Sequence, residues 1–385
     1  MTKPLRIALV TEFYYPHLGG VTEHVQNLAE HFISLGHSVV IIAARMGGDH
    51  ADAAFVRRIG RSVVIFSNGS FARLTVGLGL QGQIERILRE ERIDVVHVHG
   101  ALAPTLGLVA PAAADRLGIP VVATYHSWFP RSRLYGLFRA PLQRCLDRIA
   151  ANIAVSEPVV EALSRHFRAE WEIIPNGVRV DLFRPAPPSN GSAPSADGNG
   201  VASNGGHHRA PRLLFLGRLD PRNGLDTVLS AMPGILRHYP DAQLVVAGEG
   251  PLGPHYRRRA RSFNGSVKLV GQIYDERPAY YASADVYLCP TDKASFGITL
   301  LEAMACGTPI IASDIIGFRE LTGGGKESLL VPTRDPAAWS EATVQLIADA
   351  GRRAEMGEAG RRKAEGFSWP LVAKRVLDVY ERVLR

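Results

Sequence analysis

Short runs of aliphatic and β-branched residues alternate along the chain with longer segments whose apolar residues have helical spacing. In the first part of the chain we expect strands at Ile7–Thr11, Val39–Ala43, Val63–Ser67, Val95–His99, Val121–Tyr125 and Ile153–Val155. The same alternation begins again in the second part of the chain, where we expect strands at Leu213–Gly217, Leu244–Gly248, Val267–Val270, Val286–Cys289, Ile310–Ser313 and Leu329–Val331. Strands that alternate with helices predict βαβ units and a parallel sheet. The pattern therefore predicts an α/β chain with two doubly wound domains.

A segment of different composition separates the two halves of the chain. Residues 186–211 consist mainly of Gly, Pro, Ser, Ala and Asn, so they cannot bury enough apolar surface to become ordered. We interpret them as a flexible insert between a first domain, residues 1–185, and a second domain, residues 212–369. The last residues, 370–385, carry an apolar face at helical spacing and are predicted to form a helix.

The composition is that of an ordinary globular protein. The 385 residues are 46% apolar and 21% charged, and 44 basic against 37 acidic residues give a net charge of +7. Because we see neither an N-terminal apolar leader nor a run of about 18 apolar residues, we expect a cytoplasmic protein. The cysteines Cys145, Cys289 and Cys306 lack metal-ligand spacing. The positive charge favours anionic partners, and without a nucleic-acid-binding motif we expect no nucleic acid among them.

A loop of small residues follows the expected strand Val286–Cys289 and opens a helix. It comprises Ala294, Ser295, Phe296, Gly297, Ile298 and Thr299. Such a loop points free backbone N–H groups and the positive end of the helix dipole at one spot, which suits a phosphate. Gly297 allows close backbone approach. One turn into the helix, Glu302 is placed to accept hydrogen bonds from a sugar hydroxyl.

Two further segments carry groups that bind phosphate. Gly19 and Gly20 stand at the start of an amphipathic helix and can present N–H groups to a pyrophosphate, unless the glycines serve only the geometry of a turn. Arg218 follows the first strand of the second domain. A guanidinium binds two phosphate oxygens at once, and the alternative is a surface ion pair with Asp220 or Glu302.

Histidines mark the ends of two expected strands in the first domain. His126 follows Val121–Tyr125, at the edge where ligands of open α/β sheets bind. On position alone, a lone histidine at a strand end is more often a hydrogen-bonded structural residue than a catalyst. His97 and His99 share one face of an earlier strand, and we interpret them as structural.

These motifs resemble those of the family 4 retaining glycosyltransferases. The shared features are Pro-x-x-Gly-Gly-Val around Gly19, Tyr-His-Ser around His126, Gly-Arg at Arg218 and the loop Ser295–Thr299. The resemblance implies a GT-B fold, with two Rossmann-like domains facing across a cleft and the helix 370–385 packed back on the first domain. It also implies transfer of a hexose from a nucleotide diphosphate sugar, with retention of configuration and without a metal or a separate cofactor.

Roles for the donor-site residues follow from the same resemblance. The pyrophosphate would be bound by Gly19, Gly20, Arg218 and the loop from Ser295 to Thr299. The ribose would be bound by Glu302, the base by Ile273 and the donor sugar by His126, and we assign His126 and Arg218 as the catalytic residues. The leaving phosphate would accept the proton of the acceptor, so stabilisation of that phosphate carries much of the catalysis.

Two positions depart from the family pattern. Ala294 stands where the family has a glutamate, and Asn223 stands where it usually has a lysine. The two changes together leave the net charge of the site unchanged, so we interpret them as a retuned donor site. In this hypothesis Arg222 replaces the missing cation, and Lys293 or Asp292 reaches the sugar.

The first domain resembles one branch of the family, the phosphatidylinositol mannosyltransferases. In that branch the residues matching Asn68 and Arg73 face the inositol phosphate of the acceptor, and we add Thr22 and Arg131 as acceptor-binding residues. An amide and a guanidinium suit hydroxyls and a phosphodiester. The alternative for Asn68 and Arg73 is a turn and a surface arginine. By the same resemblance the donor is GDP-mannose, with a UDP-sugar as the alternative.

Basic and apolar side chains interleave between residues 128 and 148. The basic ones are Arg131, Arg133, Arg139, Arg144 and Arg148, and the apolar ones are Trp128, Phe129, Leu134, Tyr135, Leu137, Phe138 and Leu142. This mixture suits an anionic membrane surface, at which we expect peripheral binding. A solvated helix packed on its own domain is the alternative.

Two other functions are compatible with the sequence. The absent glutamate and lysine also suit a protein that binds a nucleotide sugar or a lipid headgroup with little or no transferase activity. A sugar-phosphate synthase of the same fold would instead transfer to a soluble acceptor and would need no contact with lipid. A panel of nucleotide sugars, tested with and without a lipid acceptor, separates these functions.

Overall fold

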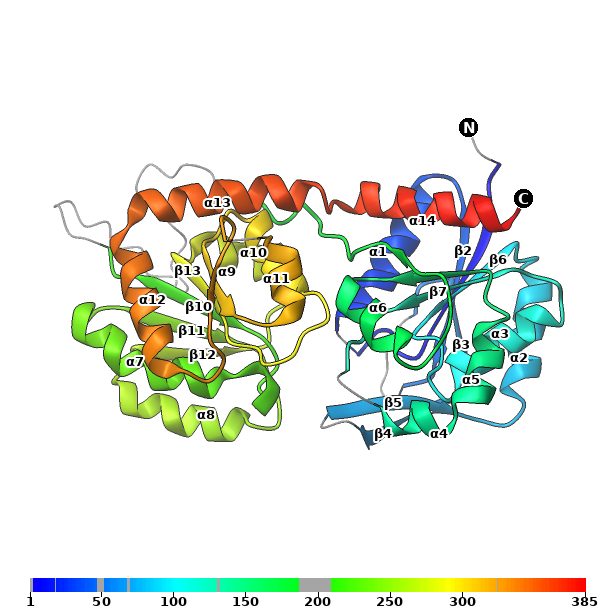
Figure 1. The fold of residues 1–385 in the computed structure, drawn as a ribbon, viewed down its shortest axis with the longest axis horizontal. Coiled ribbons are helices and arrows are strands. Elements are labelled where there is room, and N and C mark those ends of the chain that lie inside the picture. Colours follow the sequence, from blue (N-terminus) through cyan, green and yellow to red (C-terminus); the bar gives the residue numbers. More distant parts are fainter. Residues whose placement is uncertain are drawn as a thin grey trace. The chain divides into compact units, whose positions relative to one another are not determined.

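The computed structural model describes residues 3–17, 19–46, 52–67, 70–129, 132–186, 209–323 and 325–385, and for 64–67 and 70–72 it describes the backbone alone. The chain divides into a first unit, Met1–Gly177 with Trp369–Arg385, and a second unit, Val178–Ser368. Figure 1 shows the sheet and helices of each unit. Residues 187–208 of the expected insert, and the candidate acceptor residues Asn68 and Arg131, lie outside the described residues.

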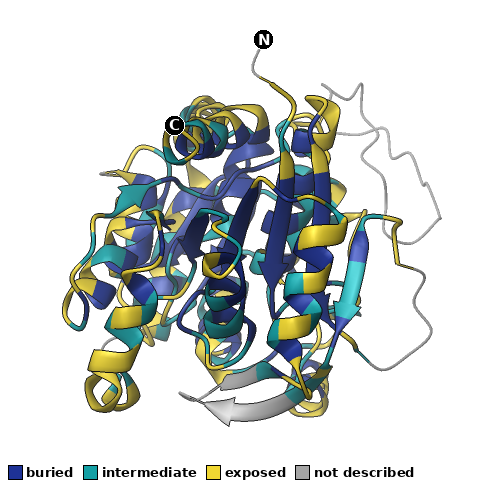
Figure 2. Cartoon of the chain, turned by 90° about the vertical axis from the view of Figure 1, so that its right-hand side faces the viewer, coloured by how far each residue is buried: buried dark blue, intermediate teal, exposed yellow. Residues whose placement is uncertain are grey.

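The first unit is built on a parallel sheet with the strand order β3-β2-β1-β6-β7-β8-β9. Its strands are β1 (Arg6–Thr11), β2 (Ser38–Ala44), β3 (Val56–Ile59), β6 (Val95–His99), β7 (Val121–Tyr125), β8 (Ala151–Ala154) and β9 (Glu172–Ile173). Every residue of β6 and β7 is buried, and the dark strands of Figure 2 show this. Strands covered on both faces need such continuous hydrophobic runs. The strand order reverses between β1 and β6, which is where sheets of this kind bind ligands.

The helices of the first unit come from both ends of the chain. They are α1 (Gly20–Ser34), α2 (Leu80–Glu90), α3 (Leu106–Asp115), α4 (Arg133–Leu137), α5 (Arg139–Leu146), α6 (Glu157–Ser164) and α14 (Trp369–Val383). Helix α14 runs beside α1 (Figure 1), and Val372, Val376 and Tyr380 join Phe32 in the core of this unit. The C-terminal helix is thus an integral part of the first unit.

One strand predicted for the parallel sheet of the first unit lies elsewhere. The run Val63–Ser67 falls in β4 (Arg61–Ser67), which pairs antiparallel with β5 (Ser70–Val76) as a separate two-stranded hairpin. Its assignment to the parallel sheet is therefore wrong. The sheet uses the short strand β3 instead, where Arg57 and Arg58 interrupt the hydrophobic pattern that would have revealed it.

The second unit contains a parallel sheet with the strand order β12-β11-β10-β13-β14-β15. Its strands are β10 (Arg212–Leu216), β11 (Gln243–Ala247), β12 (Val267–Gly271), β13 (Val286–Cys289), β14 (Ile310–Ser313) and β15 (Leu329–Val331). Its helices are η1 (Pro221–Asn223), α7 (Leu225–His238), α8 (Gly253–Ala260), η2 (Arg261–Phe263), α9 (Arg277–Ser283), α10 (Ile298–Ala305), α11 (Ile316–Thr322), α12 (Pro336–Ala348) and α13 (Ala350–Glu365). The order reverses between β10 and β13, so the loops after these strands flank the expected ligand site.

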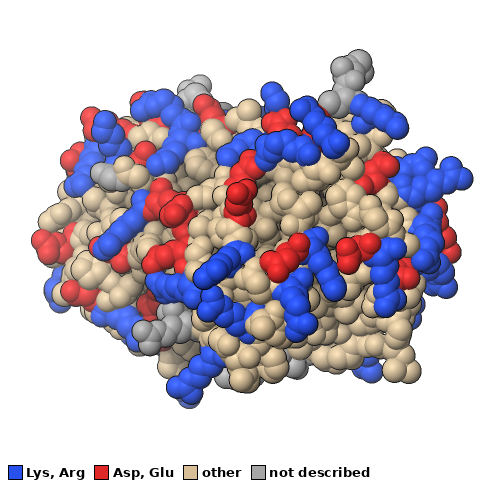
Figure 3. Space-filling view, turned by 45° about the vertical axis from the view of Figure 1, so that its right-hand side comes forward, with Lys and Arg blue, Asp and Glu red and all other residues tan. Residues whose placement is uncertain are grey.

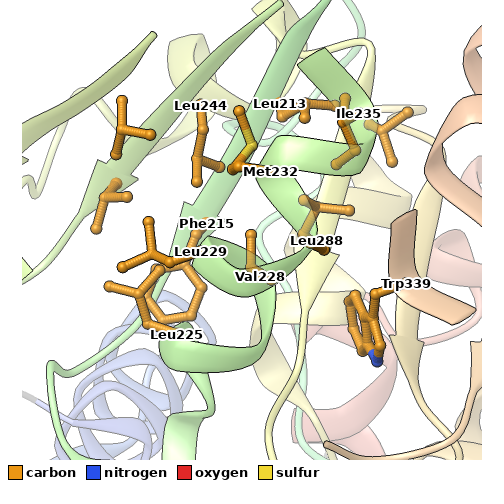
Figure 4. Packing of buried hydrophobic residues seen from close by; sticks show 14 of the residues in the cluster. Leu213, Phe215, Leu225, Val228, Leu229, Met232, Ile235, Leu244, Leu288 and Trp339 are labelled. Atoms are coloured by element: carbon orange, nitrogen blue, oxygen red, sulfur yellow. The ribbon is translucent and has the colours of Figure 1, made fainter. Parts of the chain in front are cut away.

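Figure 4 shows the core that supports these loops. Val228 and Met232 of α7 pack over Phe215 of β10 and Leu288 of β13, and Trp339 of α12 closes the cluster. All five side chains are at most 2% exposed. Burial of side chains of this size stabilises the fold by about 1.5–3 kcal/mol each, so β10 and β13 form a firm base for the loops that follow them.

The chain passes between the units after Gly177 and before Trp369, and the residues on each side of these points contact their own unit. The indole of Trp369 leaves no room for a Cβ at Gly177, because such a carbon would lie 2.5 Å from the ring. In the second unit, the backbone N–H of Val178 donates to the carbonyl oxygen of Phe367 at 2.8 Å, and an Nη1 of Arg361 donates to the carbonyl oxygen of Phe183 at 2.8 Å. The segment from Val178 to Phe183 therefore belongs with the second unit.

The surface carries charges of both signs. On the face drawn in Figure 3, basic side chains are interspersed with acidic ones, so the net charge of +7 is not gathered into a single patch there. In the part of the chain that the structure describes, no helix combines the length and the apolar character needed to span a bilayer.

Candidate active site

The loops after β10 and β13 contact each other where the strand order of the second unit reverses. The backbone N–H of Asp292 donates to the carbonyl oxygen of Arg222 at 2.9 Å. The hydroxyl of Thr291 donates to Oδ1 of Asn223 at 3.4 Å. The turn that carries the candidate phosphate-binding cations is therefore held against the loop that leads to α10.

The two candidate cations of this turn differ in their surroundings. Nε of Arg218 lies 3.9 Å from Oδ2 of Asp220, and the Arg218 side chain is 43% exposed. Arg222 is exposed at the surface of η1. The side chain of Asn223 donates to the carbonyl oxygen of Arg218 at 2.8 Å, so it stabilises the turn. An ion pair of this length on an exposed side chain is weak.

The loop before α10 has the geometry of a helix N-terminus that faces a ligand. Gly297 has φ +105° as the residue that caps α10, and a Cβ there would lie 2.9 Å from the ring of Phe318. Only glycine adopts this conformation without strain. Phe296 is buried, whereas Ala294, Ser295, Ile298 and Thr299 are half-buried. Backbone of the first turn of α10 thus remains close to solvent, where its unpaired N–H groups can bind an anion.

Glu302 is buried beneath this loop and is already engaged. Its Oε1 accepts a hydrogen bond from Nη1 of Arg277 at 2.8 Å, and its Oε2 accepts one from the hydroxyl of Tyr281 at 3.0 Å. Burial, together with the nearby carboxylate, holds the pKa of Tyr281 well above its ordinary value, so that its hydroxyl remains a donor. Glu302, expected from the sequence to bind the ribose, is thus held in place by Arg277 and Tyr281.

Ile273, expected to contact the base, lies in the loop after β12 and is half-buried. Strand β11 separates β12 from β10 in the sheet. The loops after β10 and β12 are connected through the loop after β11. The backbone N–H of Gly248 donates to the carbonyl oxygen of Gly271 at 2.7 Å, and that of Leu219 donates to the carbonyl oxygen of Glu249 at 2.9 Å.

In the first unit, the glycine turn after β1 opens α1. Gly19 is the residue before the helix, and a Cβ placed on it would come no closer than 4.0 Å to a neighbouring atom, on His17. The hydroxyl of Thr22 is buried and donates to the carbonyl oxygen of His17 at 2.7 Å. Gly19 therefore has open space next to its backbone, whereas Thr22, expected at the acceptor, supports the turn.

His97 has a structural environment. Its Nδ1 lies 2.6 Å from the hydroxyl of Tyr380 on α14, and its Nε2 lies 2.7 Å from the hydroxyl of Thr124 on β7. Burial lowers the pKa of His97 to about 3. The imidazole is therefore a neutral bridge between the sheet and the C-terminal helix.

Three other histidines meet at the carboxyl edge of the same sheet. His99 Nδ1 lies 3.2 Å from Nε2 of His126, and Nδ1 of His24 lies 2.9 Å from Oδ1 of Asn176. Burial lowers the pKa of His24 to about 4 and holds those of His99 and His126 well below 6.5, with the neighbouring histidines adding to the shift. All three rings are neutral near pH 7, so His126 meets a ligand as an uncharged hydrogen-bonding group.

This cluster was only partly evident from the sequence. His126 was singled out there, whereas His24 was not considered and His99 was grouped with the structural His97. His24 and Asn176 are 152 residues apart, so no local spacing connects them. The signal that was available is topological, because the residues after β1, β6 and β7 share one edge of a parallel sheet.

The β4–β5 hairpin, which carries the candidate acceptor residue Arg73, is anchored by a buried carboxylate. Glu12, at the end of β1, accepts hydrogen bonds from the hydroxyls of Thr75 and Thr105 and from the backbone N–H of Leu106, the last at 2.6 Å. Nη1 of Arg73 lies 3.4 Å from the hydroxyl of Ser62 on the facing strand. The hairpin is thus tied to the sheet edge that carries the histidines.

Comparison with protein families identifies both halves of the chain. Residues 18–182 match the family described as Glycosyltransferase Family 4, and residues 210–349 match the family described as Glycosyl transferases group 1. The first match begins at the end of the loop after β1, and the second includes β10 to β15 with the loops after β10 and β13.

Individual relatives match over nearly the whole length. The phosphatidyl-myo-inositol mannosyltransferase of Mycobacterium leprae is 34% identical over 98% of this chain and 97% of its own. A GDP-mannose-dependent monoacylated alpha-(1-6)-phosphatidylinositol monomannoside mannosyltransferase of Corynebacterium glutamicum is 28% identical over 99% of both chains. Among solved structures, Anabaena HepE in complex with UDP superposes with a TM-score of 0.75 at 17% identity, covering 98% of this chain and all of that one.

The structural likeness establishes a GT-B fold, and the similarity in sequence establishes the family. The neutral His126, the glycine turn before α1, and the joined loops after β10 and β13 all lie on the matched segments. The chain is therefore a member of the family 4 glycosyltransferases, a hexosyltransferase related over its whole length to phosphatidyl-myo-inositol mannosyltransferases.

Proposed function

We propose that the chain transfers mannose from GDP-mannose to a phosphatidylinositol-type lipid, with retention of anomeric configuration. The observation that carries the donor half of the proposal is the contact between the Arg222 turn and the loop before α10. The acceptor half is supported by the names of the relatives, which are phosphatidylinositol and phosphatidylinositol-mannoside mannosyltransferases. A UDP-sugar remains the alternative donor, because HepE, a structure of the same fold, was solved with UDP.

The diphosphate of the donor would be bound by Arg218, Arg222 and the N-terminus of α10. Two guanidinium groups and a helix dipole balance the negative charge that builds up on a leaving diphosphate. On this basis no metal or other cofactor is needed at the diphosphate. The leaving phosphate accepts the proton of the acceptor hydroxyl, and the neutral His126 hydrogen-bonds the sugar.

Arg222 takes the place of the lysine that relatives have at Asn223. Asn223 is occupied in stabilising the turn, since its side chain bonds the carbonyl oxygen of Arg218. Arg222 precedes it and is exposed. Of the two side chains proposed to reach the sugar in place of the acid missing at Ala294, Asp292 is paired with Arg334, at 2.8 Å from its Nε, whereas Lys293 is exposed. Lys293 is therefore the better candidate.

The acceptor phosphate would be bound by Arg73 on β5. Thr22 would act only through the turn that it supports, and Gly19 and Gly20 keep the pyrophosphate role that the resemblance implies. Arginine recognises a phosphodiester through paired N–H groups. Asn68 and Arg131 are kept as acceptor residues on the strength of the resemblance alone.

The segment α4–α5 would bring the first unit to an anionic membrane. Leu134, Leu137 and Phe138 are 62%, 75% and 50% exposed, and α4 has no buried residue. Arg139 and Arg144 are exposed beside them. Apolar side chains that stand in water next to arginines gain by entering the headgroup region of an anionic bilayer.

A donor panel tests the transferase proposal. The protein is incubated with GDP-mannose and with UDP- and ADP-sugars, and free nucleoside diphosphate is measured without acceptor and then with phosphatidylinositol vesicles. We expect GDP release from GDP-mannose that rises when the lipid is added. A higher rate with a soluble sugar phosphate than with the lipid would favour a sugar-phosphate synthase.

Vesicle flotation tests the membrane surface. We expect the protein to float with vesicles that contain anionic lipid, and the double variant Leu137→Ser/Phe138→Ser to lose most of that binding. Leu78→Ser is the matched control, because Leu78 is 94% exposed on the same unit but outside α4–α5. Equal flotation of all three proteins, or none with anionic lipid, would remove this surface from the proposal.

A second candidate function is a nucleotide-sugar or lipid-headgroup binding protein with weak transfer. The combination of Ala294 and Asn223 favours it, since by the family resemblance both stand in place of charged donor-site residues. Tight nucleotide binding without turnover, across the donor panel and with both kinds of acceptor, would select this function.

A further inference from the structure

Three imidazoles from three separate elements converge in the first unit. His24 lies on α1, His99 ends β6 and His126 follows β7, and one ring nitrogen of each lies within 4.8 Å of the other two. Zinc bound to histidine at about 2.0–2.1 Å in a tetrahedron separates the ligand nitrogens by about 3.4 Å. The pair His99 Nδ1 and His126 Nε2, at 3.2 Å, already has that separation. The ligand nitrogen of His24 lies within 4.8 Å of both.

The protonation pattern leaves a lone pair on His24. The oxygen Oδ1 of Asn176 accepts from Nδ1 of His24, so in the neutral ring that nitrogen carries the proton and Nε2 is bare. Nε2 of His24 is buried and has no hydrogen-bond partner among the described residues, so it is the atom that can bind a metal. His99 would bind through Nδ1, and its Nε2 would then carry the proton. An unsatisfied buried polar atom costs about 1–3 kcal/mol, and a metal ion would satisfy it.

The cluster also has the access that a metal needs. His24 and His99 are buried, whereas His126 is partly exposed, so a fourth coordination position can be reached past His126. His97 is no ligand, because both of its ring nitrogens are occupied by Tyr380 and Thr124.

We propose that His24, His99 and His126 form a binding site for a divalent transition metal of the zinc class. Three histidines with a fourth position open to solvent are a common zinc donor set. Bound metal takes the ring nitrogen that His126 would offer to the sugar, so it inhibits transfer. The inhibition rests on the transferase function proposed above, whereas the metal binding does not.

Cobalt titration tests the site directly. The protein carries His207→Ala and His208→Ala, which remove two consecutive histidines that lie outside the described residues. Co²⁺ is added while the visible d–d absorption is recorded. We expect one equivalent to give the intense spectrum of four-coordinate cobalt, and Zn²⁺ to abolish it. His24→Gln and His99→Gln lower the affinity at least about tenfold, which is about 1.4 kcal/mol.

His255→Gln is the control, because His255 is an exposed histidine on α8. Circular dichroism and thermal unfolding of each variant establish that it is folded. The site is refuted if no four-coordinate spectrum forms, or if folded His24→Gln binds cobalt as tightly as the parent. If the metal binds but mannosyl transfer is not reduced, the proposed inhibition is refuted and the metal site is not. A protein without any transferase activity refutes the function, while the cobalt spectrum still decides the site.

Discussion

The backbone N–H of Asp292 donates a hydrogen bond to the carbonyl oxygen of Arg222, with 2.9 Å between nitrogen and oxygen. Asp292 is itself fixed, because its carboxylate accepts from Nε of Arg334 at 2.8 Å. This one backbone bond ties the turn after β10 to the loop that leads into α10. The position of the Arg222 guanidinium and that of the N–H groups of α10 therefore depend on each other.

Replacing either cation of the β10 turn tests the proposed diphosphate site. We expect Arg218→Ala and Arg222→Ala each to weaken binding of GDP by about 10- to 100-fold, because a charge-assisted hydrogen bond is worth about 1.5–3 kcal/mol. Isothermal titration measures the affinity. Arg258→Ala is the control, since Arg258 is exposed on α8. Unchanged affinity in Arg222→Ala would end its assignment as the replacement for the family lysine.

Gly224 tests how tightly the turn is packed against the loop after β13. It has φ +71°, and a Cβ on it would lie 2.1 Å from the carbonyl oxygen of Pro290. Gly265→Ala is the matched control, because Gly265 has φ +90° but no atom within 4 Å of the added carbon. We expect Gly265→Ala to cost about 1–2 kcal/mol, which is the cost of the left-handed conformation alone.

Urea unfolding of the second unit measures the loss. Gly224→Ala should lower the free energy of unfolding by at least about 2 kcal/mol more than Gly265→Ala does, because the backbone at Pro290 has to move away from the added carbon. It should also weaken GDP binding. Equal losses of stability in the two variants would mean that the loops are not packed as described.

Glu12 tests the anchor of the β4–β5 hairpin. Glu12→Ala leaves the hydroxyls of Thr75 and Thr105 and the N–H of Leu106 without their buried acceptor. We expect a loss of about 2–4 kcal/mol in the free energy of unfolding and a raised KM for the lipid acceptor, with a smaller change in kcat. Glu91→Ala, which removes a partly exposed ion pair on the same unit, should cost less than about 1 kcal/mol. Similar losses in both variants would contradict the anchoring role.

The buried His37 should make the stability of the first unit depend on pH. It is 8% exposed, and its Nδ1 accepts a hydrogen bond from the backbone N–H of Leu5 at 3.0 Å. Burial lowers its pKa below 6.5, against a smaller opposing effect of Glu381. The unfolded chain therefore takes up the proton first as the pH falls. The contribution of His37 is fully present above pH 6.5 and is lost progressively below it.

We expect the urea midpoint of the first unit to fall between about pH 7.5 and pH 5.5. His37→Asn keeps an oxygen acceptor for Leu5 but cannot titrate, so it should flatten this dependence. His238→Asn, at an exposed histidine of the second unit, should leave the dependence unchanged. A slope that persists in His37→Asn would assign the effect to other groups.

The hydrophobic pattern was sufficient for most of the parallel sheets. Fully covered strands such as β7 consist only of buried residues, so they are conspicuous in the sequence. It failed for β3 and for the β4–β5 hairpin. Arg57 and Arg58 interrupt the first, and Val63–Ser67 has the same composition whether its partner is parallel or antiparallel.

The sequence predicts a site residue where the type of the residue and its position directly after a strand both point to ligand binding. Gly297 and Arg218 follow strands that flank the reversal of order in the second unit, which is a local signal. The pairs His24–Asn176 and Arg277–Glu302 depend on contacts between distant elements. No residue spacing encodes such contacts, so His24, Asn176 and Arg277 became apparent only in the structure.

The central claim is transfer of mannose to the lipid, and product analysis tests it most directly. Protein is incubated with GDP-mannose and phosphatidylinositol vesicles, and the lipid is extracted for mass spectrometry and for NMR of the anomeric carbon. We predict a phosphatidylinositol that carries one mannose in the configuration it had in the donor, formed together with an equal amount of GDP. Nucleotide binding without a mannosylated lipid, or a product of inverted configuration, would contradict the account.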